Sequence, residues 1–349
     1  ATGKRHMILR QPVGVVGAIA PWNFPLVLSA RKAAPALAAG CTVLLKPASA
    51  TPVCALKLAE CFEAAGVPEG VFQVVVGSSS EIGAEMLENP VCRKISFTGS
   101  TEVGRKLIQG AAATVTRLSL ELGGHAPVLV FDDADLDAAV EGALVTKFRN
   151  TGQSCIACNR IYVQDGVYED FLQKFTAAAA ALKVGPGTAP GVDIGPLIDE
   201  SAMSTARKHI DDAKARGGRV ACGGRQVGSK GFFLEPTVLT DVPPDAACMT
   251  EETFAPVAPV CAFSTEDEAV FQANNTVYGL AAYAFTGDLN RALRLSEALE
   301  AGTVGINDAV PSTSNCPFGG CKQSGWGREL GAEGLDAFME TKHVSFGGL

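Results

Sequence analysis

Short apolar runs rich in Val, Ile and Leu alternate along this chain with longer segments whose apolar residues recur at helical spacing. Strands are predicted at residues 13–19, 42–45, 71–76 and 94–97, and helices between them at 29–39 and 51–65. Strands that alternate with helices form a parallel sheet covered by helices, since each parallel pair needs a crossover connection. The sequence therefore predicts an α/β fold.

The same alternation continues in the second half of the chain. Strands are predicted at residues 118–122, 128–131, 258–263 and 281–285, and helices at 134–147, 201–216, 266–273 and 289–299. The pair Gly123-Gly124 separates two strands and suggests a hinge between two lobes. The run at 342–346 has no helix after it, which favours an edge or intersubunit strand. We therefore expect two α/β lobes and a short terminal strand.

Composition argues against several classes of protein. The 29 basic and 37 acidic residues give a net charge of −8, and no basic cluster is interleaved with aromatic residues, so nucleic acid is not expected as a partner. No apolar run reaches the roughly 20 residues that span a bilayer, so we expect a soluble protein. Eleven scattered cysteines suit a reducing, intracellular compartment, and four scattered histidines show no metal-binding spacing.

Two side chains suggest covalent catalysis. Cys155 ends the segment FRNTGQSC (148–155), and Glu121 lies 34 residues earlier in LELGG (120–124). A thiol beside small residues and a carboxylate in an apolar strand supply a nucleophile and a base. Any one of eleven cysteines is, however, more often a small buried hydrophobe than a nucleophile.

Three further segments each have a functional and a structural interpretation. TGSTEVG (98–104) follows a strand and opens a helix, which suits phosphate binding but also an ordinary strand-to-helix junction. Lys46 follows another strand and could bind ribose or phosphate, or be an exposed loop lysine. Asn23 lies between two prolines and could donate to an oxyanion, or could bond its own turn.

These segments occur together and in order, and in this combination the chain resembles the aldehyde dehydrogenases, especially the succinate-semialdehyde dehydrogenases. The matching motifs are PWNFP (21–25), KPAS (46–49), FTGS (97–100), LELGG (120–124), GQSC (152–155), EETF (251–254) and PFGG (317–320). The resemblance covers essentially the whole chain. It implies a Rossmann-type dinucleotide-binding domain at 1–123, incomplete at its N-terminus, a catalytic α/β domain at 124–325, and a C-terminal segment at 326–349 with an oligomerisation strand.

By this resemblance, Cys155 attacks the aldehyde carbonyl and forms a thiohemiacetal. The Asn23 amide and the backbone N–H of Cys155 would hold the oxyanion. Hydride transfer would leave a thioester, which water activated by Glu121 would hydrolyse. A CoA-acylating reaction is less favoured, because Glu at the general-base position favours water as the acyl acceptor.

The resemblance also assigns cofactor residues. They are Trp22, Asn23, Lys46, Ser49, Gly99, Ser100, Leu122 and Glu252, the last toward the nicotinamide ribose. NAD-preferring members commonly carry Glu where this chain has Ser49, and a Glu there repels a 2′-phosphate. We therefore predict NADP as the preferred cofactor, with NAD remaining an alternative.

The substrate prediction rests on residues that match the family's carboxylate site. Arg31 and Arg149 match its arginines, and Ser312 matches a hydroxyl partner, beside the reacting Cys155. Succinic semialdehyde carries a carboxylate that such residues would bind. Glutarate semialdehyde or another aldehyde stays an alternative, since one methylene changes discrimination only modestly. A non-catalytic truncated remnant is a further alternative.

The chain departs from the family pattern in three places. The second cysteine is Cys158, three residues after Cys155 instead of two, so it is either a redox switch or a packed thiol. Ala255 stands where Gly is usual. The family also has a segment before the stretch that matches Ala1, so we expect a fragment of a longer product. The resemblance implies a homodimer or homotetramer and γ-aminobutyrate breakdown. We expect an intracellular, cytoplasmic location, with a mitochondrial one left open.

Overall fold

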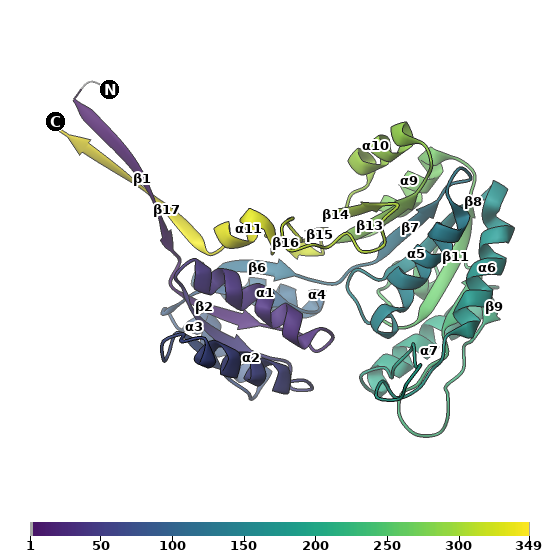
Figure 1. Ribbon diagram of the computed structural model, residues 1–349, viewed down its shortest axis with the longest axis horizontal. Coiled ribbons are helices and arrows are strands. Elements are labelled where there is room, and N and C mark those ends of the chain that lie inside the picture. Colours follow the sequence, from purple (N-terminus) through teal and green to yellow (C-terminus); the bar gives the residue numbers. More distant parts are fainter. Residues whose placement is uncertain (1–2, 349) are drawn as a thin grey trace. The chain divides into compact units, whose positions relative to one another are not determined.

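The structure is a computed structural model that describes residues 3–348, and the chain forms two compact units (Figure 1). Unit 1 contains the chain up to Leu122, Ser312–Gly319 and Gly325 onward. Unit 2 contains Gly123–Pro311 and Gly320–Ser324. The α/β fold predicted from the sequence is confirmed. The functions assigned to the three sequence regions stay predictions.

Unit 1 is built on a six-stranded sheet with the order β16-β6-β5-β2-β3-β4. Its strands are β2 (Val15–Ile19), β3 (Thr42–Lys46), β4 (Phe72–Val74), β5 (Cys92–Thr98), β6 (Arg117–Glu121) and β16 (Gly325–Trp326). All neighbours are parallel except β16, which is antiparallel to β6. The helices are α1 (Pro25–Ala38), α2 (Val53–Ala64), α3 (Ser79–Glu88), α4 (Thr101–Ala111) and α11 (Gly331–Asp336).

Apolar side chains cover both faces of this sheet. Val16 and Ala18 belong to one buried cluster, whereas Ile95, Phe97 and Leu120 belong to another. A parallel sheet with helices on both faces buries its strands on both sides, so the strands show continuous apolar runs instead of alternation. The sequence therefore located these strands well.

The strand order reverses direction inside the sheet of unit 1. From β2 the chain proceeds outward through β3 to β4, and then returns to the other side of β2 for β5 and β6. Crossovers on the two sides of such a switch point diverge, and ligands of open α/β sheets bind in the crevice at the carboxyl ends of the strands there. The switch point lies between β2 and β5.

A two-stranded ribbon completes unit 1. Strand β1 (Lys4–Pro12) pairs antiparallel with β17 (Met339–Gly347) along nine residues, from Lys4 opposite Gly347 to Pro12 opposite Met339. Figure 1 shows the two strands, purple and yellow, projecting from the rest of unit 1. Most of their side chains are exposed, including Met7, Ile8 and Phe346.

Unit 2 contains a seven-stranded sheet with the order β14-β13-β7-β8-β11-β10-β9. Its strands are β7 (Ala126–Val130), β8 (Cys158–Gln164), β9 (Arg219–Cys222), β10 (Thr237–Thr240), β11 (Val257–Phe263), β13 (Ala281–Phe285) and β14 (Thr303–Ile306), and only β9 runs antiparallel to its neighbour. The helices are α5 (Leu136–Phe148), α6 (Tyr168–Ala181), α7 (Glu200–Ala215), α8 (Ala247–Thr250), α9 (Glu266–Asn274) and α10 (Leu289–Ala298), with short 3₁₀ turns at Arg149–Gly152 and Asp165–Val167. A small pair, β12 (Tyr278–Gly279) and β15 (Cys321–Lys322), lies apart from this sheet.

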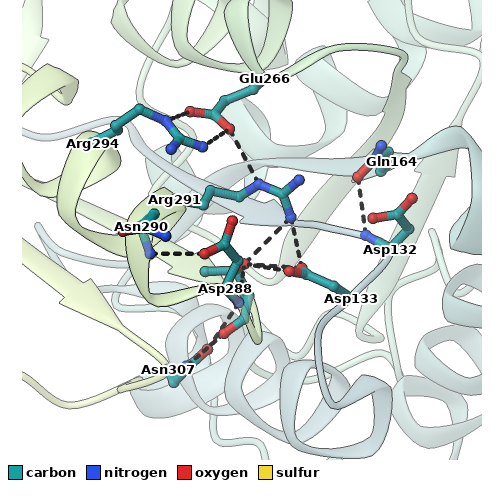
Figure 2. Close-up of polar contacts among 10 residues, drawn as sticks. Asp132, Asp133, Gln164, Glu266, Asp288, Asn290, Arg291, Arg294 and Asn307 are labelled. Atoms are coloured by element: carbon teal, nitrogen blue, oxygen red, sulfur yellow. Dashed lines mark hydrogen bonds and ion pairs between the residues drawn. The ribbon is translucent and has the colours of Figure 1, made fainter.

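The carboxyl edge of the unit 2 sheet is occupied by ion pairs (Figure 2). Arg291 of α10 binds Asp133, just after β7, at 2.8 Å and Glu266 at 3.2 Å, while Arg294 binds both oxygens of Glu266. Arg291 also stacks on the Phe131 ring at 4.4 Å. Cys155, by contrast, precedes β8 and therefore lies at the amino edge of this sheet.

None of the helices in residues 3–348 is long and apolar enough to cross a membrane. Over the same residues, no group of three or more His, Cys, Asp or Glu side chains is placed to hold a metal ion.

Candidate active site and cofactor site

The carboxyl edge of the unit 1 sheet carries most of the residues predicted for the cofactor. Trp22 and Asn23 follow β2, Lys46 ends β3, and Gly99 and Ser100 follow β5. Because these strands are parallel, their carboxyl ends lie along one edge. This edge includes the switch point between β2 and β5, where a dinucleotide would be expected to bind.

Lys46 and Ser49 have different surroundings at this edge. Lys46 is buried, and its Nζ donates to Oγ of Ser79 at 2.6 Å. Burial lowers the pKa of Lys46. Ser49 is exposed in the loop after β3, so its hydroxyl is accessible to a ligand. Sequence reasoning missed Ser79, although the spacing of Ser78 and Glu81 is a capping signal that marks the start of α3.

Gly99 and Ser100 form a tight turn into α4. Ser100 caps the helix by accepting a hydrogen bond from the backbone N–H of Val103 at 3.4 Å. The N–H of Gly99 donates to the carbonyl of Glu121 at 3.0 Å, and a Cβ on Gly99 would lie 2.4 Å from the Phe97 ring. A larger residue at position 99 would therefore have to displace the Phe97 ring, and the N-terminus of α4 provides a partial positive charge of the kind that binds phosphate.

Glu121 ends β6 as a buried carboxylate. Among the residues that the structure describes, its Oε2 has no hydrogen-bond partner. A Cβ on Gly319 would lie 2.8 Å from its Oε1, so the PFGG segment packs directly on the carboxyl group. Burial, and then the charge of Glu329, raise the pKa of Glu121 well above its usual value. A carboxylate with a raised pKa is a better general base near neutral pH than an ordinary one.

Lys32 and Glu329 form a buried ion pair that the sequence did not reveal. Lys32 Nζ lies 2.5 Å from Oε1 of Glu329 and 2.6 Å from Oγ1 of Thr98. Lys32 is fully buried on the face of α1 that also buries Leu28 and Ala36. A charged residue on an apolar helical stripe was the only available signal. The positive charge of Lys32 partly offsets the effect of Glu329 on the pKa of Glu121.

Arg31 and Ser312, both predicted to bind a substrate carboxylate, lie together in unit 1. Nη2 of Arg31 donates to Oγ of Ser312 at 3.0 Å, across 281 residues of sequence. The guanidinium also stacks on the Phe318 ring, 5.0 Å from its centroid. A hydroxyl and a ring hold the guanidinium in place, and these two contacts include no carboxylate, while the charge of Arg31 also acts to lower the pKa of Glu121.

In unit 2, an unusual backbone conformation leads to Cys155. Asn150 and Thr151 have φ of 52° and 60° and Gly152 has φ of 72°, so three successive residues are left-handed. Buried Gln153 fixes this turn: its Oε1 accepts from the N–H of Ile198 at 2.9 Å. Strained backbone of this kind needs support from its surroundings and is common at functional sites. Cys155 itself is partly exposed.

Gly124 connects Cys155 to Glu252. A Cβ on Gly124 would lie 2.1 Å from the carbonyl oxygen of Cys155, so only glycine fits there. The N–H of Gly124 donates to Oε1 of Glu252 at 3.0 Å. Loss of hydration raises the pKa of Glu252 to about 7. The structure therefore brings the predicted nucleophile and the predicted ribose-binding carboxylate to one glycine of the LELGG motif.

The remaining predicted residues are placed as follows. Leu122 is buried, and Gly104 of α4 packs against its side chain. Arg149 is exposed at the start of the turn that leads to Cys155, and its sharing of a substrate carboxylate with Arg31 stays a prediction. Ala255 is fully buried, and its carbonyl is the atom that a Cβ on Gly152 would meet at 2.4 Å.

Cys158 is the first residue of β8 and is fully buried. Burial raises the pKa of its thiol, and Thr146 donates to its sulfur at 3.3 Å. A thiol with these surroundings is a weak nucleophile. Of the two interpretations left open by the sequence, these contacts favour the packed thiol.

The sheet of unit 1 has the strand order of a dinucleotide-binding sheet. Unit 2 carries a cysteine at a glycine-containing turn. Together these features are typical of a dinucleotide-dependent enzyme with a cysteine nucleophile. Comparison with known proteins gives the family. The sequence profile of the aldehyde dehydrogenase family matches residues 1–344, and the chain belongs to this family. The family predicted from the sequence motifs is therefore confirmed.

Individual relatives support the same assignment. The chain is 53% identical over 344 residues to the succinate-semialdehyde dehydrogenase [NADP(+)] of Escherichia coli, covering 99% of this chain and 71% of that protein. It is 52% identical over 346 residues to a glutarate-semialdehyde dehydrogenase of Pseudomonas aeruginosa, covering 99% of this chain and 72% of that protein. A crystal structure of a succinate-semialdehyde dehydrogenase from Burkholderia pseudomallei has a TM-score of 0.98 and 50% identity, covering 99% of this chain and 72% of that chain.

Proposed function

We propose that the protein oxidises succinic semialdehyde to succinate by covalent catalysis at Cys155, with NADP as the preferred cofactor. The observation that carries this proposal is the approach of Gly124, the last residue of the LELGG motif, to the Cys155 carbonyl, since both residues belong to unit 2. The names of several relatives about 50% identical to this chain support the same reaction.

The first step is attack of the Cys155 thiolate on the aldehyde carbon. A C–S bond forms, and the carbonyl π electrons move to oxygen to give a thiohemiacetal oxyanion. The Asn23 amide and the Cys155 backbone N–H would donate to that oxyanion. The left-handed turn at 150–152 supports this role, because it orients the backbone immediately before the nucleophile.

A bound NADP would supply the hydride acceptor, so that oxidation of the thiohemiacetal carbon would leave a thioester on Cys155. Lys46, the hydroxyl of Ser49 and the N-terminus of α4 at Ser100 would hold the phosphates and the 2′-substituent. Glu252 would accept hydrogen bonds from the nicotinamide ribose. The donor set fits a phosphorylated dinucleotide, since Ser49 is exposed and carries no charge to repel a 2′-phosphate.

Glu121 would then take a proton from the water that hydrolyses the thioester. Its Oε2 is not committed to another group in the described part of the chain, and its raised pKa suits proton abstraction near neutral pH. The C–S bond breaks as water adds, the acid leaves, and the sulfur of Cys155 recovers its thiolate or thiol form.

The substrate class follows from the anion-binding residues. Relatives are named for succinate semialdehyde, glutarate semialdehyde and 3-sulfolactaldehyde, which all carry an anionic group besides the aldehyde. Arg31, held by Ser312 and Phe318 without a neutralising carboxylate in these contacts, would bind that group, with Arg149 as a second cation. Glutarate semialdehyde is the second candidate, supported by the 52% identical relative of that name.

The test is direct. The purified chain is assayed for NADPH formation with succinic semialdehyde, glutarate semialdehyde and the uncharged butanal, with Cys155→Ala as the matched inactive variant. We expect activity that requires Cys155 and a higher kcat/KM for the two charged substrates than for butanal. Equal kcat/KM values for all three would refute the substrate class, and activity that survives Cys155→Ala would refute the mechanism.

Assembly and location complete the proposal. The exposed apolar residues Met7, Ile8 and Phe346 on the β1–β17 ribbon support pairing with another subunit, as a homodimer or homotetramer. Light scattering of the chain before and after charge substitutions at Ile8 and Phe346 tests this. An intracellular, cytoplasmic location is proposed, with the mitochondrion as the alternative.

A further inference from the structure

A buried histidine contacts both neighbours of Glu252 in the sequence. His209 of α7 is fully buried. Its Nδ1 lies 2.9 Å from Oγ1 of Thr253, and its Nε2 lies 3.4 Å from Oε2 of Glu251. No step of the proposed reaction uses His209, so these contacts need another explanation.

The surroundings of His209 determine where its proton lies. Burial lowers the pKa of His209, so the imidazole is neutral at neutral pH. Nε2 has no hydrogen-bond partner among the described residues, and the acceptor nearest to it in these contacts is the Glu251 carboxylate at 3.4 Å, which favours the tautomer with the proton on Nε2. Nδ1 therefore accepts a hydrogen bond from the Thr253 hydroxyl. Lys208, Asp212 and the buried His125 are the other charged or titratable groups that face this imidazole.

Helix α7 also contacts the start of the segment 247–253, which contains Glu252. Asp212, three residues after His209, accepts a hydrogen bond at 2.8 Å from the N–H of Ala247, which begins α8. Residues 247–253 are thus attached to α7 at both ends, by Asp212 and by His209. Glu252 extends from this clamped segment, and its Oε1 accepts from the Gly124 N–H.

Phe254, which follows Thr253, has a strained backbone that the contacts of residues 247–253 with α7 would hold in place. Phe254 has φ of 50°, a left-handed conformation that is costly for an aromatic residue. A strained backbone beside Glu252 would relax, and move the carboxylate, unless neighbouring contacts opposed the movement. The bond from Thr253 to His209 is adjacent to the strained residue and opposes it.

We propose that His209 is a positioning residue, which acts through Thr253 to fix the Glu252 carboxylate where the cofactor ribose binds. This inference rests on the proposed function of Glu252. It predicts that loss of the His209–Thr253 bond weakens cofactor binding and leaves the binding of succinic semialdehyde unchanged. The loss of one buried hydrogen bond corresponds to a change in affinity of roughly 10-fold.

The test compares Thr253→Val, which keeps the shape and removes the hydroxyl, with Thr253→Ser, which keeps the hydroxyl. The direct measurement is the dissociation constant of NADPH by fluorescence titration, with the KM values of NADP and succinic semialdehyde and the melting temperature alongside. We expect Thr253→Val to raise the NADPH constant and the NADP KM by roughly 10-fold. Thr253→Ser should restore both, and the KM of succinic semialdehyde should stay constant.

Further variants distinguish an error in the proposed role of Glu252 from an error in the proposed role of His209. His209→Leu should match Thr253→Val, and the double variant should add little, because the two changes break one bond. Lys208→Gln alters an exposed neighbour of Glu251 and is the matched control, with no effect expected. If Glu252→Gln leaves the NADPH constant unchanged, the proposed role of Glu252 is wrong and this inference fails with it. If Glu252→Gln weakens binding but Thr253→Val does not, only the positioning role is refuted.

Discussion

Replacement of Gly124 by alanine tests whether the geometry around Cys155 is required for catalysis. The added Cβ would lie 2.1 Å from the Cys155 carbonyl oxygen, whereas real Cβ contacts are essentially never closer than 3.0 Å. The two backbone segments must therefore separate by about 0.9 Å, the difference between these distances. Neither atom belongs to a flexible side chain, so the backbone beside the nucleophile has to move.

A displacement of about 1 Å at a reacting centre can reduce the rate by about 100-fold. We therefore expect Gly124→Ala to lower kcat for NADPH formation by about that factor. The rate of Cys155 alkylation by iodoacetamide is measured in parallel, because it reports the thiol without the cofactor. The same shift moves the N–H that binds Glu252, so the NADPH dissociation constant should also rise.

The control is Gly83→Ala in α3, where an added Cβ would meet nothing within 4 Å. Alanine is favoured over glycine inside a helix, so this variant should keep full activity and be equally or more stable. A kcat for Gly124→Ala within twofold of the unchanged protein would show that the approach to Cys155 does not matter for the reaction.

Three other predictions follow from the described contacts. Arg31→Gln should raise the KM of succinic semialdehyde roughly 10-fold or more without changing that of butanal, since one charge-assisted hydrogen bond contributes ~1.5–3 kcal/mol; equal changes for both would contradict the assignment. Because the pKa of Glu252 is raised to about 7, the carboxylate forms as pH rises through 7, and NADPH should bind more tightly above that pH. The 2′-phosphate titrates in a similar range, so Glu252→Gln supplies the baseline, and an identical pH profile in this variant would exclude the effect. Buried Cys158 should resist alkylation while Cys155 is modified, as followed by peptide mass spectrometry; equal labelling rates would favour the redox switch instead.

Local sequence patterns were sufficient for strands that are buried along a continuous apolar run. Strands β2 and β3 were predicted because they lie inside a sheet that is covered on both faces and therefore have short apolar runs. Strand β1 was missed for the opposite reason. Nearly all its side chains are exposed, and the strand that pairs with it in the described part of the chain, β17, lies more than 300 residues away in the sequence. Its stability depends on that distant pairing and leaves no pattern in the strand itself.

The candidate site also contains residues that local motifs identify and contacts that they do not reveal. Cys155, Glu121 and Ser49 were identified by the motifs around them, because each depends on neighbours in sequence. The Lys32–Glu329 pair joins residues 297 apart, and neither has a motif that names the other. The approach of Gly124 to Cys155 was equally hidden, since a glycine pair between strands also suits a flexible hinge. Contacts between distant segments are set by the folded sheets and were not available from the sequence.

The two carboxylates of the proposed site, Glu121 and the partly buried Glu252, differ in their surroundings, and the difference supports the separate roles proposed for them. In Glu121, burial and the charge of Glu329 raise the pKa, the Lys32 charge opposes them, and Oε2 stays uncommitted among the described residues. In Glu252, burial raises the pKa, while the hydrogen bond from Gly124 opposes it and occupies Oε1. A general base needs an oxygen that can take a proton from water, whereas a ligand-binding carboxylate needs a fixed direction. Glu121 therefore suits proton transfer, and Glu252, held beside the nucleophile's own backbone, suits the placement of the ribose.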